Sequence, residues 1–252
     1  MKKLVIANWK MNPNSLSEAK KLFSSIKKQI KSFKKSKIVI CPPSIYLQNL
    51  VSISGKAKIE FGAQNISNKA HGSFTGEISA KMIYDSGARY VILGHSERRK
   101  MGEDDIFISE KVLLALESKI KPIVCVGESK RDREGEFLSF LENQIEASLS
   151  MISKDLVSKI IVAYEPIWAI GKTALDAIKP DQVQQMYIFI KKVLVSMYGK
   201  DTAEKIKIIY GGSVEPSNVS GLTESGVDGF LVGHASLKAS YFNDILKNID
   251  EI

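Results

Sequence analysis

Residues Ile160–Trp168, with the sequence IIVAYEPIW, decide the fold class of this chain. Five residues of apolar character run without interruption, and an acidic residue and a proline follow them at once. Continuous rather than alternating apolar character is typical of a strand that is covered on both faces, as strands of parallel sheets are. The stretch therefore predicts a buried parallel strand that ends at Tyr164 and presents Glu165 at its carboxyl end.

Seven further runs of the same kind are spread along the chain. Together with Ile160–Tyr164 they predict eight strands, the others being Leu4–Ala7, Ile38–Cys41, Ile59–Ala63, Tyr90–Leu93, Pro122–Val126, Ile206–Tyr210 and Gly229–Val232. Amphipathic stretches with apolar residues at helical spacing lie between them and predict surface helices. These helices are expected at Ser15–Phe33, Ile106–Leu116, Phe137–Leu149, Val183–Met197 and Tyr241–Ile249, with Pro180 and Asp181 as a start signal before the fourth.

Eight strands that alternate with helices, without linkers or low-complexity segments, fit a closed barrel or a large doubly wound sheet. A dinucleotide-binding sheet should carry a G-x-G-x-x-G pattern after its first strand. The first strand instead continues into Asn8–Asn12, with the sequence NWKMN, and the glycine pattern does not occur in the chain. We therefore expect an α/β fold with a single domain over residues 1–252, a (β/α)8 barrel.

The bulk composition agrees with one large domain. The chain has 252 residues, of which 44% are hydrophobic, and no apolar run approaches the ~18 residues of a membrane span. Trp9 and Lys10 follow the short apolar start before a secretory segment could form, so we expect a cytoplasmic protein without a membrane partner. Cys41 and Cys125 lie inside apolar runs and are expected to be buried thiols, not disulfide partners or metal ligands.

The formal net charge is +8, and only five of the 36 basic residues are arginines. Surfaces that read or grip nucleic acids usually depend on arginine and on interleaved aromatic residues. Here the lysines between Lys20 and Lys35 follow a helical period or its trailing loop, which favours a solvated helix face over a nucleic-acid site. A non-catalytic basic binding module remains an alternative, and it predicts salt-sensitive binding to nucleic acid without enzymatic turnover.

Polar residues with chemical potential follow four of the predicted strands. In barrels the carboxyl ends of the strands meet at one mouth, so these residues should converge there. Taken singly, a lysine after a strand is usually solvated and a histidine is usually structural. Together they offer a base, a donor, a cation and an anion cradle, which is the combination that an active site needs. They are Asn8 and Lys10 after the first strand, His95 and Glu97 after the fourth, Glu165 after the sixth and Gly211–Ser213 after the seventh.

Each of these residues has an expected role. Glu165 precedes a proline and a tryptophan, and a poorly hydrated carboxylate there is suited to taking a proton from a carbon next to a carbonyl. Ser96 is expected to cap a short helix, which would place His95 at a helix N-terminus as a neutral hydrogen-bond donor. Lys10 adds a positive charge, with Glu97 as its partner and Asn8 as an uncharged donor. Ser213 with its glycines, and Gly233 after the last strand, suit a phosphate group.

Seven motifs, in order over most of the chain from Asn8 to about Leu237, resemble the triosephosphate isomerase family. They are Asn8–Asn12 (NWKMN), Gly62–Asn65 (GAQN), Phe74–Glu77 (FTGE), Gly94–Arg99 (GHSERR), Cys125–Glu128 (CVGE), Ala163–Gly171 (AYEPIWAIG) and Tyr210–Val214 (YGGSV). The resemblance implies a TIM barrel that interconverts dihydroxyacetone phosphate and glyceraldehyde 3-phosphate in glycolysis and gluconeogenesis, with no cofactor and no metal. It also assigns Glu165 as base, His95 as electrophile, Lys10 and Asn8 as positioning groups and Glu97 as a supporting carboxylate.

The resemblance further implies a phosphate site, a lid and a dimer. The phosphate site would contain Gly171, Ser213, Gly233 and His234. The lid would contain Pro166, Ile167, Trp168, Ala169, Ile170, Lys172, Thr173 and Ala174, and its closure would exclude water. The loop with Thr75 and Glu77, together with Gln64, would lie at the interface of a homodimer, with Thr75 next to the partner's Lys10.

Two features depart from the family pattern. The lid passes directly from Gly171 to Lys172, two residues short at its tip, and the extra residues Leu175–Ile178 lengthen its far hinge. We expect a lid that still closes, with altered contacts. His234 replaces the second glycine of a pair after the last strand, and its ring would either add a donor to the phosphate or point into solvent beside it.

A barrel aldolase that uses a Schiff-base lysine or a metal is the second enzymatic alternative. The three histidines, His71, His95 and His234, are too dispersed in the sequence to indicate a ligand cluster. Lys10 is the one lysine at an apolar strand end that the sequence offers for a Schiff base. Borohydride trapping with substrate would discriminate between an aldolase and an isomerase.

Overall fold

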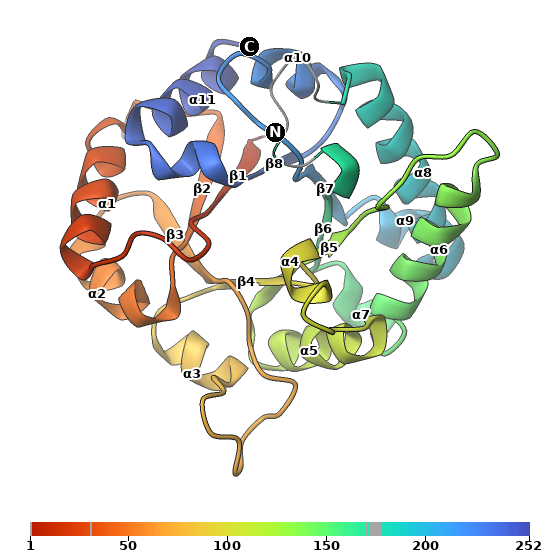
Figure 1. Cartoon of the computed structure of the whole chain (residues 1–252), viewed down its shortest axis with the longest axis horizontal. Helices are drawn as coiled ribbons and strands as arrows, with labels where there is room; N and C mark the ends of the chain where they lie inside the picture. The colour runs from red at the N-terminus through yellow and green to blue at the C-terminus, as the bar shows by residue number, and fades with distance from the viewer. Residues whose placement is uncertain (1, 31, 170, 172–177) are drawn as a thin grey trace.

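The structure is a computed structural model, and it describes residues 2–30, 32–169, 171 and 178–252. Eight strands close into a barrel in the order of the sequence, and helices surround the barrel on the outside (Figure 1). The strands are β1 (Lys3–Asn8), β2 (Ser36–Cys41), β3 (Ile59–Ala63), β4 (Tyr90–Leu93), β5 (Lys121–Val126), β6 (Ile161–Tyr164), β7 (Lys207–Tyr210) and β8 (Gly229–Val232). The predicted (β/α)8 barrel is confirmed, and each predicted strand agrees with an observed one to within two residues.

All neighbouring strands run parallel, and the pairing of β1 with both β2 and β8 closes the sheet. Leu4 lies opposite Lys37 of β2 on one side and opposite Gly229 of β8 on the other. The approach to β8 is close, because a Cβ atom at Gly229 would come within 1.9 Å of the Leu4 carbonyl oxygen. Parallel order brings the carboxyl ends of all eight strands to the same mouth of the barrel.

Helices connect the strands and cover the barrel. Those of the described ranges are α1 (Leu16–Ile30), α2 (Ser44–Ser54), α3 (Ala80–Asp85), α4 (Ser96–Arg99), α5 (Asp105–Glu117), α6 (Glu136–Ser148), α7 (Lys154–Val157), α8 (Pro180–Tyr198), α9 (Lys200–Ala203), α10 (Val219–Glu224) and α11 (Ala239–Glu251), with 3-10 turns η1 (Ile167–Ala169) and η2 (His234–Leu237). The five predicted helices correspond to α1, α5, α6, α8 and α11. The first ends at Ile30, three residues before the predicted Phe33, whose ring still packs against the core.

The long α8 begins at Pro180, as its start signal predicted. The sequence reasoning named none of α2, α3 and α10, and it named none of the single-turn helices apart from the turn after His95. Within the described ranges, no helix combines the length and the apolar character that crossing a bilayer requires.

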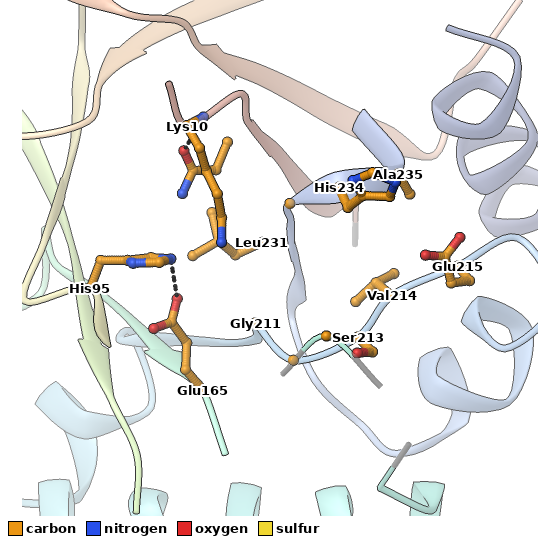
Figure 2. A pocket seen from close by; sticks show the side chains of 14 residues that line it. Lys10, His95, Glu165, Gly211, Ser213, Val214, Glu215, Leu231, His234 and Ala235 are labelled. Carbon is orange, nitrogen blue, oxygen red and sulfur yellow. Dashed lines mark hydrogen bonds and ion pairs between the residues drawn. The ribbon is translucent and has the colours of Figure 1, made fainter. Parts of the chain in front are cut away.

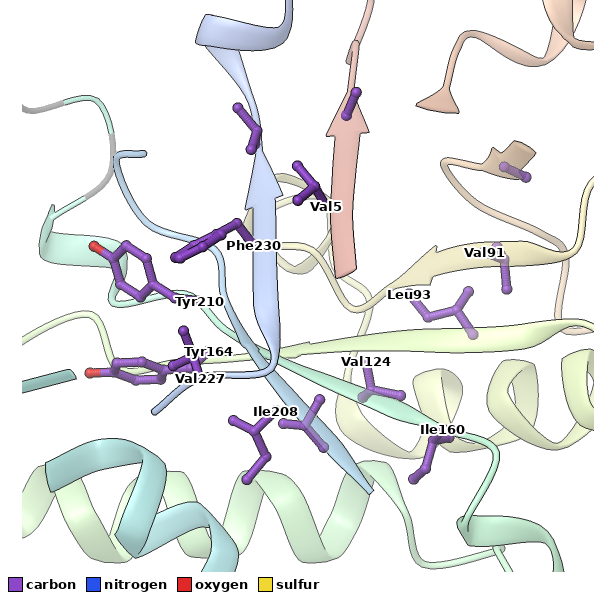
Figure 3. Packing of buried hydrophobic residues seen from close by; sticks show 14 of the residues in the cluster. Val5, Val91, Leu93, Val124, Ile160, Tyr164, Ile208, Tyr210, Val227 and Phe230 are labelled. Carbon is purple, nitrogen blue, oxygen red and sulfur yellow. The ribbon is translucent and has the colours of Figure 1, made fainter. Parts of the chain in front are cut away.

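The alternation of side chains along the strands produces two apolar layers. Inward-facing residues fill the barrel with a small cluster that includes Leu4, Ile92 and Ile161. Outward-facing residues form a larger cluster under the helices, and Figure 3 shows Phe230, Ile208 and other members of it around the strands. The strands are therefore apolar on both faces, which is why their sequences read as continuous apolar runs.

Cys41 and Cys125 belong to the inner cluster and are buried free thiols, as predicted. Burial raises the pKa of both thiols well above the ordinary value for cysteine, because the thiolate form would lie in apolar surroundings. Cys41 therefore acts as a small apolar group in the barrel interior, whereas the Cys125 thiol also bonds to the Glu165 carboxylate, which raises its pKa further.

Candidate active site

A pocket of about 190 Å³ opens at the carboxyl ends of the strands. Figure 2 shows Lys10, His95 and Glu165 on one side of it, with their side chains directed toward one another. Ser213 and His234 lie on the other side, and Gly211 lies next to Glu165. The lining residues are Asn8, Lys10, His95, Glu165, Gly171, Gly211, Gly212, Ser213, Val214, Glu215, Leu231, Gly233, His234 and Ala235.

Glu165 follows directly on β6 and is the most deeply placed acid of this pocket, with 2% of its surface exposed. Its backbone N–H donates to the carbonyl of Val126 at 2.8 Å, which continues the pairing of β5 with β6 and fixes the start of the side chain. One carboxylate oxygen lies 3.5 Å from Nε2 of His95, and the other accepts from the backbone N–H of Ser96 at 3.4 Å. The carboxylate is thus held at the end of the strand and faces the imidazole.

Two glycines make room for Glu165. A Cβ atom at Gly127 would lie 1.9 Å from the Glu165 carbonyl oxygen, and one at Gly211 would lie 2.9 Å from its Cγ. Each distance is too short for a real side chain, so both positions require glycine for the present placement of the glutamate. The sequence analysis did not predict that Gly127 and Gly211 make room for Glu165, although each glycine follows directly after an apolar run.

His95 is 7% exposed and forms the N-cap of the short helix α4. Its Nδ1 atom accepts a hydrogen bond from the backbone N–H of Glu97 at 3.2 Å. A ring nitrogen that accepts in this way carries no proton, so the neutral ring carries its proton on Nε2, the atom that faces Glu165. The ring thus directs Nε2 toward the pocket, and its role as a hydrogen-bond donor to a substrate stays a prediction.

The prediction that Ser96 caps α4 was wrong. Ser96 is the first residue of α4, is buried, and lies inside the helix instead of capping it. The His95 ring takes the place of a serine hydroxyl because its Nδ1 reaches the second N–H of the helix. The backbone N–H of Ser96 is thereby left to bind the Glu165 carboxylate.

Lys10 adopts a left-handed backbone conformation with φ of 52°, which is uncommon for a residue other than glycine. Two side chains support this conformation: Asn8 accepts from the Lys10 N–H at 3.0 Å, and Gln64 donates to the Lys10 carbonyl at 2.8 Å. The Lys10 ammonium forms an ion pair with Glu97 at 2.5 Å. Strain of this kind concentrates at functional sites, and here it directs the ammonium group into the pocket.

Glu97 lies at the rim and pairs with Lys10, as predicted. Burial would raise the pKa of its carboxyl, but the hydrogen bond from Lys10 and the nearby positive charges outweigh burial and hold that pKa below its ordinary value. The carboxylate is therefore ionised at neutral pH, and it keeps the ammonium of Lys10 in one position.

The second side of the pocket consists largely of backbone and small side chains. Gly171, Ser213, Gly233 and the exposed residue His234 all line the pocket, so the structure brings the predicted phosphate residues together with the catalytic candidates. Gly233 lies close to the lysine: a Cβ atom there would be 3.5 Å from Cε of Lys10. Glu215 also lines this side and was not predicted.

Four of the predicted lid residues lie within the described ranges: Pro166, and Ile167, Trp168 and Ala169 of η1. The indole N–H of Trp168 and the hydroxyl of Tyr164 both donate to Oε1 of Glu128, at 2.8 Å and 2.9 Å. The Ser213 hydroxyl donates to the Ala169 carbonyl at 3.0 Å. Ile170, Lys172, Thr173 and Ala174 lie outside the described residues, as do residues 175–177 of the predicted hinge extension.

The predicted interface residues lie apart from the pocket. Thr75 and Glu77 are exposed on the loop between β3 and α3, which projects away from the barrel in Figure 1. Gln64 is half-buried and bonds within its own chain, to the carbonyls of Lys10 and Cys41. Its support of the Lys10 backbone was not predicted, although the motif at Gly62–Asn65 marked the position.

The sequence analysis did not predict the burial of Lys111. Lys111 of α5 is 1% exposed and bonds to Glu103 at 2.7 Å and to Asn65 at 2.9 Å. Burial lowers its pKa, and the contact with Glu103 opposes this change. Lys111 does not line the active-site pocket, and its contacts hold the segment that follows α4. Among the described residues, no three histidine, cysteine, aspartate or glutamate side chains gather closely enough to hold a metal ion.

A buried carboxylate, an imidazole and an ammonium held by an ion pair surround one pocket, which Gly171, Gly211, Gly212 and Gly233 also line. The fold and this site define a class of protein: a (β/α)8-barrel isomerase that moves protons between neighbouring atoms of a small anionic substrate.

Comparison with known proteins gives the particular family. The family model for triosephosphate isomerase matches residues 3–249. Similar proteins include the triosephosphate isomerase of Fusobacterium nucleatum subsp. nucleatum, 45% identical over 98% of this chain and 99% of its own, and that of Endomicrobium trichonymphae, 43% identical over 98% of both. The triosephosphate isomerase of Rhodopirellula baltica is 42% identical over 97% of this chain and 96% of its own. The chain belongs to the triosephosphate isomerase family, which acts in glycolysis.

Proposed function

We propose that this pocket interconverts dihydroxyacetone phosphate and D-glyceraldehyde 3-phosphate by proton transfer through an enediolate, without a cofactor. We also propose that residues 1–252 act as a single catalytic domain. The observation that carries the proposal is the convergence of three groups on one pocket. The Glu165 carboxylate lies 3.5 Å from the His95 ring, and Lys10, held by Glu97 at 2.5 Å, lines the same space.

The chemistry assigned to Glu165 is removal of a proton from C1 of dihydroxyacetone phosphate and its return to C2. A buried carboxylate with few water contacts is suited to this step, because water does not compete for its lone pairs. The electrons of the broken C–H bond form the enediolate, whose negative charge develops on the carbonyl oxygen. The same carboxyl group holds the transferred proton in between, so no other base is needed for the carbon atoms.

His95 and Lys10 act on the oxygen atoms. The Nε2–H of His95 donates to the oxygen on C2 as charge develops there, and the hydroxyl proton on O1 replaces it, so the ring is neutral again at the end. The Lys10 ammonium adds a positive charge that stabilises the anion before and during the transfer. Asn8 is 5% exposed and lines the same pocket, and we assign it a positioning role beside Lys10.

We assign the phosphate group to the wall opposite the catalytic residues. Gly171, Ser213, Gly233 and His234 line this wall, and small residues let backbone N–H groups approach a phosphate closely. His234 is exposed, so its ring reaches the edge of the bound phosphate at most. The described half of the lid, Pro166–Ala169, contacts this wall through Ser213, and we propose that the lid closes over the substrate.

We further propose that the protein is a cytoplasmic homodimer. The loop around Thr75 supports a dimer, because it projects from the barrel and exposes Phe74 at 45% of its surface. Met11, three residues after β1, is exposed at 89%, and Met101, in the turn after α4, is exposed at 76%. Apolar groups of this size gather in interfaces, and an isologous contact would bring Thr75 of one subunit to Lys10 of the other. The cytoplasmic location follows from the role of the family in glycolysis.

The first test is a coupled isomerase assay on the wild type and on Glu165→Gln. The substitution keeps the shape and the contact with the Ser96 N–H but removes the basic lone pairs. We expect kcat to fall by at least about 10²-fold, the contribution of a general base, while KM changes little.

Glu146→Gln is the matched control, because Glu146 is an exposed residue of α6 outside the pocket. It should retain the wild-type kcat. If Glu165→Gln had the same kcat as this control, another group would have to be the base and the proposed mechanism would be wrong.

A further inference from the structure

The opposite, N-terminal end of the barrel carries a concentration of lysines that the isomerase reaction does not use. Inward-facing residues of the strands include Val39 of β2, Ile123 of β5 and Ile209 of β7. Side chains of a strand return to the same face every two residues, so the lysine two positions before each of these faces the barrel axis as well. These lysines are Lys37, Lys121 and Lys207.

Two more lysines join them from the loops that lead into β6 and β7. We define the N-terminal lysine ring as Lys37, Lys121, Lys159, Lys205 and Lys207. All five line one cavity of about 270 Å³, together with Leu4, Tyr90, Ser158, Ile160 and Ile161. A single water needs only ~10–15 Å³ of such space, so the cavity has room for a ligand of many atoms.

The ring has a large excess of positive charge. Glu60 of β3 forms an ion pair with Lys37 at 2.9 Å and accepts a hydrogen bond from the Tyr90 hydroxyl at 2.9 Å. Throughout the described part of the chain, no carboxylate comes within the 4.0 Å of an ion pair from the amine of any of the other four lysines. Five ammonium groups therefore face one carboxylate, which leaves four positive charges around the cavity.

Like charges placed together cost free energy. Lys121, Lys159 and Lys205 are exposed, so water and mobile ions offset part of this cost, and an anion bound among the lysines would offset more of it. A general role of lysines here is to offset the partial negative charge at the C-terminal ends of the helices. That role does not explain the three strand lysines, whose inward direction takes them toward the barrel axis and away from the surrounding helices.

We propose that the N-terminal lysine ring binds a small polyanion with two or more phosphate groups. Four unneutralised ammonium groups match the charge of a di- or triphosphate better than that of a single phosphate, and lysine binds phosphate as a point charge without demanding one geometry. The apolar interior of the barrel separates this site from the catalytic pocket, and Leu4 and Ile161 lie at the N-terminal end of that interior. Binding at the ring is therefore independent of substrate, and the proposal does not rest on the proposed function.

The test is calorimetric titration of the full chain with inorganic tripolyphosphate, in the presence of saturating triose phosphate to keep the catalytic pocket filled. We expect one bound tripolyphosphate, with an affinity that falls when the ionic strength rises from about 0.01 M to 0.15 M. Lys121→Gln combined with Lys207→Gln should weaken binding about tenfold, a few-fold for each lost charge.

The matched control is Lys20→Gln combined with Lys21→Gln, which removes the same charge from the exposed face of α1. It should change the affinity by less than about twofold. Glu60→Gln supplies a change of opposite sign: it removes the carboxylate that pairs with Lys37 and should strengthen binding about two- to fivefold, which a folding defect could not produce.

Three results would overturn the proposal: no binding in the presence of substrate, equal weakening in the two double variants, or no strengthening in Glu60→Gln. Titrations with ATP and AMP identify the source of the phosphates. If ATP binds more tightly than tripolyphosphate and AMP does not bind, the ring is assigned to a nucleoside triphosphate. If tripolyphosphate binds more tightly than ATP, the ring is assigned to inorganic polyphosphate. Retained isomerase activity in both double variants would show that the two sites are separate.

Discussion

At the scale of single residues, the position of Glu165 depends on its polar contacts and also on neighbouring glycines that have no side chain. The Glu165 carboxylate lies next to the His95 ring, the Ser96 N–H and the Cys125 thiol, and its side chain lies against Gly211, where no Cβ is present. A sequence shows which polar groups follow the strands, so Glu165, His95 and Lys10 could be predicted. It does not show which glycines are required by close contacts, because that depends on distances across strands.

The position of His95 illustrates the same limit. Its place after the fourth strand was evident from the sequence, but serine is the preferred N-cap, and this preference pointed to Ser96. The ring itself caps α4 and uses Nδ1 to do so, which leaves the Ser96 N–H for the base. Propensity describes residues on average, and here the Ser96 N–H is bonded to Glu165, so that the His95 ring and not the Ser96 hydroxyl caps the helix.

Gly211→Ala tests the requirement for space beside the base. The new methyl group would lie 2.9 Å from Cγ of Glu165, so the carboxylate must shift. We expect kcat to fall by about ten- to a hundredfold, since misplacement of a catalytic group by an ångström is costly, with little change in the melting temperature. Steady-state kinetics and thermal unfolding measure the two effects.

Gly221→Ala in α10 is the control. A Cβ atom there would meet Pro180 at 3.4 Å, an ordinary contact, and alanine is the better helix former. Its kcat should equal that of the wild type. Equal activity of Gly211→Ala and Gly221→Ala would contradict the assigned role of Gly211.

At the scale of elements, the strands could be predicted much better than the helices. A strand buried on both faces leaves a continuous apolar run, and all eight runs were present in the sequence. The helices were predicted where apolar residues recur at helical spacing among charged or polar ones, as in α1 and α6. Helix α2, with the sequence SIYLQNLVSIS, contains no charged residue, so the contrast between its faces is weak even though Tyr46, Leu47 and Leu50 are buried.

The start of α5 offers a test of local helix stability. The Asp104 side chain accepts from the N–H of Phe107 at 2.8 Å and so caps the helix. We expect Asp104→Ala to lower the free energy of unfolding by about 1 kcal/mol, because the N–H loses its partner and the favourable charge at the helix N-terminus is lost. Denaturation in urea measures the change.

Asp104→Asn retains an acceptor at the same position. Its free energy of unfolding should fall by only a few tenths of a kcal/mol, roughly the contribution of the negative charge at the helix N-terminus. A loss in Asp104→Asn as large as that in Asp104→Ala would show that the charge, and not the hydrogen bond, stabilises the start of α5. Kinetic constants of both variants should remain those of the wild type.

At the scale of the whole molecule, the proposed dimer would bring the loop between β3 and α3 of one subunit to Lys10 of the other. Within one chain Lys10 is held by Asn8, Gln64 and Glu97, and the proposed dimer would add Thr75 of the partner subunit to these contacts. The sequence resemblance implied the contact with Thr75 of a second subunit, and no property of a single chain tests it. This part of the site therefore stays a prediction.

Thr75→Arg tests the dimer. A guanidinium group without a partner in a buried interface costs ~3–5 kcal/mol, so we expect the dissociation constant to rise by about 10²-fold or more. Sedimentation equilibrium measures the association, and isomerase activity should fall together with the fraction of dimer. Asn143→Arg, at an exposed position of α6, adds the same charge elsewhere and should leave both unchanged.

Dissociation in both variants would indicate a general effect of charge, and no dissociation in Thr75→Arg would place the interface elsewhere. A monomeric Thr75→Arg protein with full activity would separate the two proposals, since the catalytic pocket would then function without its neighbour.

Closure of the sheet has a further consequence for behaviour in solution. Because β8 pairs with β1, every strand of the barrel has a hydrogen-bonded neighbour on each side. An open sheet offers unpaired N–H and C=O groups at its margins, where foreign strands can add and seed fibres. The native barrel presents no such margin, so it needs none of the short, charged or kinked outer strands with which open sheets discourage aggregation.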